Sequence, residues 1–108
     1  MPFEPTFWAP LYARIMGGTL EEHPELHQAA SPAFHVDADT VPFMMAHGTA
    51  DIDSPYQQSR NMVAALTEAE IEYVYAEFPG KDHGGVIGQP QTWDLALTFV
   101  EYQLHPER

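Results

Sequence analysis

The sequence predicts an α/β fold in which two parallel strands alternate with two helices. Residues 41–47 are a short apolar run bounded by Pro42 and Gly48, which predicts a buried strand. Residues 71–78 are rich in β-forming residues with apolar residues on both faces, as a strand covered on two sides requires. After each run, apolar residues recur at helical spacing, over 55–69 and 90–104. Because a strand, helix, strand order normally forms a right-handed crossover, we expect the two strands to be parallel neighbours.

The first 40 residues carry signals for short helices. Helices are predicted at 11–16 and 24–30, because the first segment ends at a glycine pair and the second begins with one proline and ends before another. We therefore expect one partial domain over residues 1–108, with a helical lead-in at 1–40 and a strand–helix–strand–helix unit at 41–108.

The helix predicted at 55–69 begins with a clear capping signal. Ser54 precedes Pro55, and Gln57 stands three residues after the serine, which is a capping-box pattern with proline at the first helical position. We expect Ser54 to cap this helix. The second strand then leads into a glycine-rich loop over residues 80–88, before the last helix begins.

Asp51 and His83 stand in the loops that follow the two predicted strands. The carboxyl ends of neighbouring parallel strands meet at one edge of the sheet, and ligands of open parallel sheets bind beyond that edge. A carboxylate that accepts a hydrogen bond from one imidazole nitrogen leaves the other to take a proton, as the acid and base of a catalytic triad do. A helix-capping aspartate and a solvated loop histidine are the ordinary alternatives for these residues.

Two stretches of the chain carry a family resemblance. Residues 47–84 read HGTADIDSPYQQSRNMVAALTEAEIEYVYAEFPGKDHG, and residues 17–32 read GGTLEEHPELHQAASP. The first stretch resembles the C-terminal part of the α/β-hydrolase fold, in particular esterases and prolyl-oligopeptidase-like serine hydrolases, and the second is similar to the segment before the acid strand in acyl esterases. The resemblance implies a partial α/β-hydrolase fold with Asp51 as triad acid and His83 as triad base. Ser54 stands where the family usually has valine.

The nucleophile of such enzymes has no counterpart in the sequence. It is a serine on a G-x-S-x-G elbow that precedes the acid and the histidine, and none of Ser31, Ser54 and Ser59 has that setting. No oxyanion loop is recognisable either. The resemblance implies a serine hydrolase portion that supplies the triad acid and base, with carboxylic-ester hydrolysis by acyl transfer as the favoured reaction. A prolyl-oligopeptidase-like serine peptidase portion and a catalytically inactive, hydrolase-derived interaction module are the alternatives.

Charge and the open sheet edge limit the partners that the chain can have. Sixteen acidic residues against four basic ones give a net charge of −12, which disfavours nucleic acid and anionic membranes. A small ester or peptide is the expected substrate, and a complementing N-terminal hydrolase half or a second copy of the chain would cover the open edge. No signal peptide or membrane-spanning run is recognisable, so a cytoplasmic location is the default expectation.

No cofactor and no metal are expected. The chain has no cysteine, and His23 and His27 lack an evident third ligand, so an acidic cation-binding protein has the least support of the functional hypotheses. Asp53 and Asp82 are expected to be solvated or structural, and His47 to be a core or backbone-bonded histidine. The aromatic residues expected to pack in the core, rather than to line an acyl pocket, are Phe7, Trp8 and Tyr12.

Overall fold

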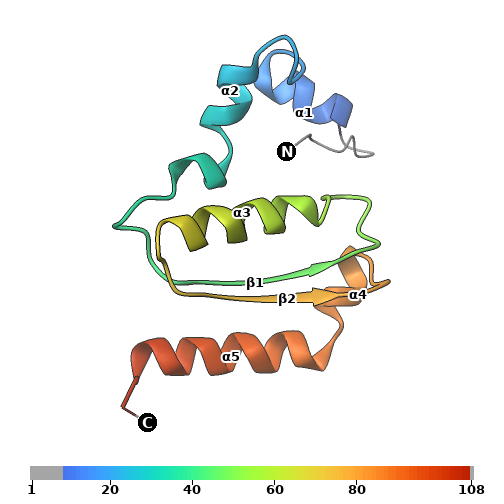
Figure 1. Ribbon diagram of the computed structural model, residues 1–108. Helices are drawn as coiled ribbons and strands as arrows, with labels where there is room; N and C mark the ends of the chain where they lie inside the picture. The colour runs from blue at the N-terminus through green and yellow to red at the C-terminus, as the bar shows by residue number, and fades with distance from the viewer. Residues whose placement is uncertain (1–8, 108) are drawn as a thin grey trace.

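The computed structural model describes residues 9–107 and contains the predicted helices and strands in the predicted order, together with two short helical segments that were not predicted, η1 and α4 (Figure 1). Short helical segments come first, a strand–helix–strand unit follows, and two further helices end the described part of the chain. The elements are α1 (Ala9–Met16), α2 (Pro24–Ala29), the 3-10 helix η1 (Pro32–His35), β1 (Phe43–Gly48), α3 (Gln57–Glu68), β2 (Tyr73–Phe78), α4 (His83–Ile87) and α5 (Pro90–Leu104).

The two strands form a parallel sheet. Their register places His47 opposite Glu77 and Gly48 opposite Phe78. Helix α3 lies over one face of this sheet and α5 over the other (Figure 1). The α/β class and the parallel strand pair are confirmed, and the loops that follow the two strands leave from the same edge of the sheet.

The buried core is small. Met62 and Leu66 of α3 and Val86 of α4 are the buried large apolar side chains among the described residues, with exposures of 8%, 0% and 6%. Helix α3 contacts both strands and α4 contacts β1. The attachment of α3 to the sheet therefore depends on few side chains, with Leu66 as the most enclosed.

The strands are less buried than their apolar composition predicts. Gly48 is buried, but every other residue of β1 and β2 is only half-buried. A sheet of two strands leaves an unpaired edge on each side, and α5 contributes no buried residue. The expectation of fully buried strands is therefore wrong for the described part of the chain, although a helix lies over each face of the sheet.

Helix α3 begins later than predicted and without the predicted cap. Its N-cap is Tyr56, which makes no side-chain capping bond, so the prediction that Ser54 caps this helix is wrong. The backbone of Ser54 is already engaged, because its N–H donates to Asp51 and its carbonyl meets His47. These contacts hold Ser54 in the turn before the helix rather than at the helix end.

The segment 80–88 is not the loop that its glycines predict. It contains the short helix α4, which begins at His83, so this histidine lies at a helix start. Asp82 caps α4, because its Oδ1 accepts a hydrogen bond from the N–H of Gly85 at 2.6 Å. The structural role expected for Asp82 is confirmed, and the cap explains why a helix forms despite two consecutive glycines.

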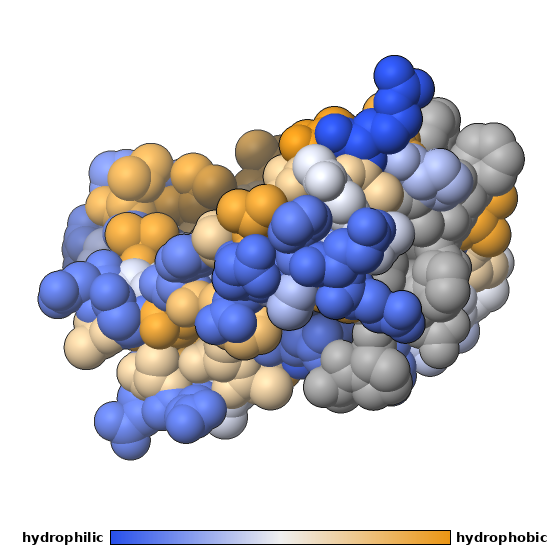
Figure 2. All heavy atoms as spheres, turned by 90° about the horizontal axis from the view of Figure 1, so that it is seen from above, coloured by the Kyte–Doolittle hydropathy of each residue, from blue (hydrophilic) through white to orange (hydrophobic). Residues whose placement is uncertain are grey.

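The molecule exposes more surface than a compact protein of its size. Its accessible surface is 7509 Å², whereas about 6,000 Å² is typical for its mass. Its radius of gyration is 15.5 Å, against about 13 Å for a compact domain of this length. Figure 2 shows apolar side chains exposed on the face seen from above. Large apolar side chains are also exposed on α5, namely Trp93, Leu95, Leu97, Val100, Tyr102 and Leu104. No helix within residues 9–107 is long and apolar enough to cross a membrane.

We expect Leu66→Ala to lower the free energy of unfolding by about 2–5 kcal/mol, because it opens a cavity in a core with few members. The matched control is Leu97→Ala, which removes the same atoms from a side chain that is 70% exposed and should change stability by less than about 1 kcal/mol. Urea denaturation followed by circular dichroism measures both. Equal losses in the two variants would contradict the assignment of the core.

Candidate active site

The loop that follows β1 is fastened to the segment that follows β2. The backbone N–H groups of Thr49 and Ala50 donate to the carbonyls of Phe78 and Lys81 at 3.1 and 3.0 Å. Gly48 permits this approach, because a Cβ at its position would collide with the Lys81 carbonyl. The side chains that come next on each segment are therefore brought together.

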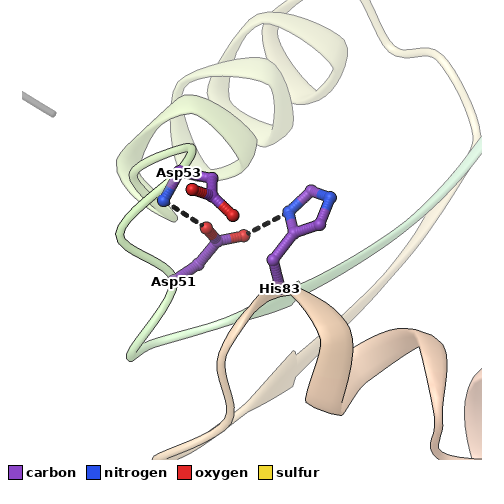
Figure 3. Close-up of side chains that lie close together, drawn as sticks. All are labelled: Asp51, Asp53 and His83. Atoms are coloured by element: carbon purple, nitrogen blue, oxygen red, sulfur yellow. Dashed lines mark hydrogen bonds and ion pairs between the residues drawn. The ribbon is translucent and has the colours of Figure 1, made fainter. Parts of the chain in front are cut away.

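Asp51 and His83, the two site residues expected from the sequence, are in direct contact. His83 Nδ1 lies 2.9 Å from Asp51 Oδ2 (Figure 3). The Asp51 side chain is 3% exposed, whereas the His83 side chain is 54% exposed. Figure 3 shows the second ring nitrogen, Nε2, pointing away from Asp51. One imidazole nitrogen is thus held by a shielded carboxylate, and the other faces away from it in an exposed ring.

The second oxygen of Asp51 shapes the loop. Oδ1 accepts hydrogen bonds from the backbone N–H groups of Asp53 at 2.8 Å and Ser54 at 2.9 Å. These bonds fold the chain into the turn that precedes α3. The alternative that Asp51 caps the next helix is wrong, because the N-cap of α3 is Tyr56, but the same side chain does have a structural role in the loop.

The surroundings shift the pKa of both groups in the direction that favours the charged form. Burial by itself raises the pKa of Asp51, but hydrogen bonds, chiefly from the Ser54 backbone and from His83, outweigh it and lower this pKa below its ordinary value. The hydrogen bond to Asp51 and the attraction of its charge raise the pKa of His83. The pair therefore favours an imidazolium and a carboxylate side by side.

His47 also contacts Asp51. Its Nε2 lies 2.7 Å from the carbonyl of Ser54 and 3.4 Å from Asp51 Oδ2. Its Nδ1 lies 2.7 Å from Ser59 Oγ in α3. The backbone bond confirms the expectation for His47, but the contacts with Asp51 and Ser59 were missed. The HGTAD spacing, which places a histidine and an aspartate around the same strand end, is the signal that could have indicated the first contact.

No serine in the described residues is arranged as a nucleophile for His83. Ser59 is the serine whose hydroxyl meets an imidazole, but that imidazole belongs to His47. Ser59 lies inside α3, whereas a nucleophilic serine sits on a strained turn between a strand and a helix. The structure thus agrees with the lack of a G-x-S-x-G elbow in the sequence.

A small pocket opens beside the pair. It has a volume of about 100 Å³, and its lining residues are Ala46, His47, Gly48, Asp51, His83, Val86 and Ile87. Ligand pockets of complete enzymes usually measure about 300–1,000 Å³. The pocket is therefore smaller than the ligand pocket of a complete enzyme.

Asp51, Asp53 and His83 also present ligand atoms within 4.8 Å of one another, a grouping able to hold a metal ion. Both oxygens of Asp51 already accept hydrogen bonds, and His83 uses Nδ1 for one of them. A metal that bound through Nδ1 of His83 would have to replace the hydrogen bond between His83 and Asp51.

The histidines considered as metal ligands have other neighbours. His23 Nδ1 lies 3.5 Å from Glu25, and His27 Nε2 lies 2.9 Å from the carbonyl of Gly18. The contact of His27 fastens α2 to the turn after α1. These residues are thus engaged in the lead-in segment, away from Asp51 and His83.

Tyr12, one of the three aromatic residues expected in the core, lies beside the loop that carries Asp51. Tyr12 is only half-buried, and its hydroxyl lies 3.4 Å from the carbonyl of Asp53. Phe7 and Trp8 fall outside the described residues. The core prediction is therefore wrong for Tyr12, because α1 meets the loop that carries Asp51 instead of packing against the sheet.

Residues 5–105 match the prolyl oligopeptidase family. The chain belongs to this family. It is 37% identical over 71 residues to the esterase LipC and 39% identical over 85 residues to the esterase LipQ, both of Mycobacterium tuberculosis. These matches cover 65% and 78% of the chain, but the chain spans only 18% of either relative. The relation expected from the sequence, to the C-terminal portion of an α/β-hydrolase esterase, is confirmed.

Solved structures of esterases share the fold of this family member. A truncated carbohydrate esterase from gut microbiota superimposes with a TM-score of 0.67 at 30% identity, covering 74% of this chain and 28% of the other. Thermogutta terrifontis esterase 2, in a form phosphonylated by sarin, gives a TM-score of 0.70 at 22% identity and covers 98% of this chain and 37% of the other. The partial α/β-hydrolase fold is thereby confirmed.

We expect the pair to stabilise the protein most between about pH 4 and 6.5, where both groups are charged. The lowered pKa of Asp51 contributes stability that is present above its unfolded value and is lost as the pH falls through the folded one. The raised pKa of His83 contributes stability that is present below its unfolded value and is lost as the pH rises through the folded one.

Thermal unfolding followed from acidic to alkaline pH tests this expectation. The Tm difference between the native chain and Asp51→Asn should be largest inside that window. Asp94→Asn, which makes the same charge change on an exposed position of α5, is the control. A difference that is constant with pH would contradict the charged pair.

Proposed function

We propose that this chain supplies the acid and the base of a serine ester hydrolase. The observation that carries the proposal is the contact between Asp51 and His83, in which a shielded carboxylate holds Nδ1 of an exposed imidazole at the carboxyl edge of a parallel sheet. The relatives LipC and LipQ, which are esterases, support an ester as the substrate.

The proposed reaction is acyl transfer through a serine outside these 108 residues. The serine hydroxyl attacks the ester carbonyl while His83 Nε2 takes its proton, and the same nitrogen then protonates the departing alcohol, which leaves an acyl-enzyme. Water activated by His83 releases the carboxylic acid and restores the serine. Asp51 keeps the proton of the neutral ring on Nδ1 and stabilises the imidazolium that forms in each half of the reaction.

The proposal includes a polypeptide that carries the serine and the oxyanion donors. Its support is the surface of 7509 Å², larger than a compact protein of this mass exposes, and the small share of each relative that the chain spans. A second copy of the chain would bring no G-x-S-x-G elbow and another net charge of −12. We therefore propose that a complementing hydrolase segment, rather than a second copy of this chain, supplies the serine and the oxyanion donors.

Hydrolysis of p-nitrophenyl acetate tests the function. The chain is assayed alone and as one polypeptide with the sequence encoded in frame upstream of it. We expect activity only in the longer form, with kcat/KM reduced by about 10³-fold or more in His83→Ala and by about 10²-fold or more in Asp51→Asn. The matched control is His35→Ala, which alters an exposed histidine of η1 and should leave kcat/KM unchanged.

Three other outcomes of these assays would contradict the proposal. Undiminished activity in His83→Ala would overturn the proposed base. Faster cleavage of a dipeptidyl p-nitroanilide than of the ester would favour the peptidase alternative. A longer form that contains a G-x-S-x-G elbow and hydrolyses neither substrate would favour the interaction module.

The pH profile of the longer form provides a separate prediction. Because His83 acts as a base in its neutral form, kcat/KM should rise with pH, and the raised pKa of His83 should place the midpoint above about 6.5. Asp51→Asn should move this midpoint to lower pH, since it removes the charge that holds the proton. A midpoint that does not move in Asp51→Asn would contradict the assignment.

A further inference from the structure

His47 occupies a position from which it can hold the acid in place. It is the penultimate residue of β1, and its side chain is only 12% exposed. Its ring contacts three groups from different parts of the chain: the Ser54 carbonyl in the loop, the Asp51 carboxylate and the Ser59 hydroxyl in α3. The ring therefore connects the strand, the loop that carries Asp51 and the helix that follows.

The partners of the ring determine where its proton lies. A backbone carbonyl can only accept, so at 2.7 Å from the Ser54 oxygen Nε2 must carry hydrogen. Nδ1 of a neutral ring can then accept from the Ser59 hydroxyl, which lies at 2.7 Å. With its proton on Nε2, the His47 ring satisfies its contacts with Ser54 and Ser59, and Nε2 also lies 3.4 Å from Asp51 Oδ2.

The acidic residue across the sheet from His47 has partners of its own. Across the sheet, Glu77 of β2 stands opposite His47 in the strand register. The guanidinium of Arg60 donates to both oxygens of Glu77 at 2.8 and 2.9 Å, and the Tyr75 hydroxyl donates to one of them at 2.8 Å. The carboxylate of Glu77 is thus already balanced by a cation. Asp51, which lies on the loop, is an acidic neighbour whose carboxylate contacts the ring.

We propose that His47 is a positioning residue that keeps the Asp51 carboxylate turned toward His83. The inference rests on the proposed function, in which Asp51 orients the base. His83 is 54% exposed, whereas His47 and Asp51 are both shielded, so the contact from His47 is the one that solvent disturbs less. His47 acts through Asp51 and the loop, and it moves no proton in the reaction.

The test measures the pKa of His83 by NMR titration of the imidazole in the folded 108-residue chain. His47→Leu removes both ring nitrogens, and His47→Gln retains a side-chain N–H donor near the place of Nε2. We expect His47→Leu to lower the pKa of His83 by about half a unit or more, since a mispositioned carboxylate attracts the proton less, and His47→Gln to restore most of this shift. The other acidic groups that attract the charge of His83, Asp53 and Asp82, stay unchanged in both variants.

Two further measurements keep the inference falsifiable if His47→Leu does not fold. The tautomer of His47 in the native chain, read from imidazole nitrogen shifts, should be the Nε2–H form, and an Nδ1–H form would overturn the inference. Ser59→Ala removes only the partner of Nδ1 and should leave the His47 tautomer and the pKa of His83 near their native values. If Ser59→Ala lowered the pKa of His83 and His47→Leu did not, the pKa would depend on α3 rather than on His47.

The same titration separates this inference from the proposed function. Asp51→Asn should lower the pKa of His83 more than any change at His47, because it removes the charge itself. An unchanged pKa in Asp51→Asn would count against the acid–base pair. A lowered pKa in Asp51→Asn together with an unchanged one in folded His47→Leu would overturn the positioning role alone. His35→Leu, at an exposed histidine, is the matched control and should leave the pKa of His83 unaltered.

Discussion

Parallel pairing of β1 with β2 is the constraint on which the candidate site depends. Because both strands run in the same direction, their carboxyl ends and the segments that leave them share one edge of the sheet. Gly48, the last residue of β1, lets the two segments touch there, since a side chain would collide with the Lys81 backbone. Residues that are 32 positions apart in the chain, Asp51 and His83, thereby come within hydrogen-bond distance.

Asp51 combines a structural role in the loop with the contact to His83. One oxygen accepts two backbone N–H groups and so sets the turn before α3, and the other faces two imidazole rings. The carboxylate is therefore held from several sides while remaining almost inaccessible to water. Such rigid support is what an orienting acid requires, because its effect on the base falls when its geometry relaxes. The ring of His83, in contrast, is exposed.

Local rules predicted the order of the elements better than their ends. The apolar periods of the strands and of the two longer helices are strong enough to be recognised in the chain itself. The capping pattern at Ser54 failed because the backbone of that residue is engaged by Asp51 and His47, which are local competitors that a capping rule does not weigh. The helix α4 was missed because Asp82, rather than the residues inside the helix, stabilises its start.

The amino-acid sequence by itself determined the α/β class, the two candidate site residues and the lack of a G-x-S-x-G serine. Each of these features depends only on residue types and their spacing along the chain. Only the tertiary structure decided that Asp51 contacts His83, that His47 and Ser59 belong to the same network, and that the strands are half-buried. The physical reason is that such contacts depend on which strand pairs with which and how closely two segments approach. These properties arise from packing between distant residues, and local propensity carries little information about them.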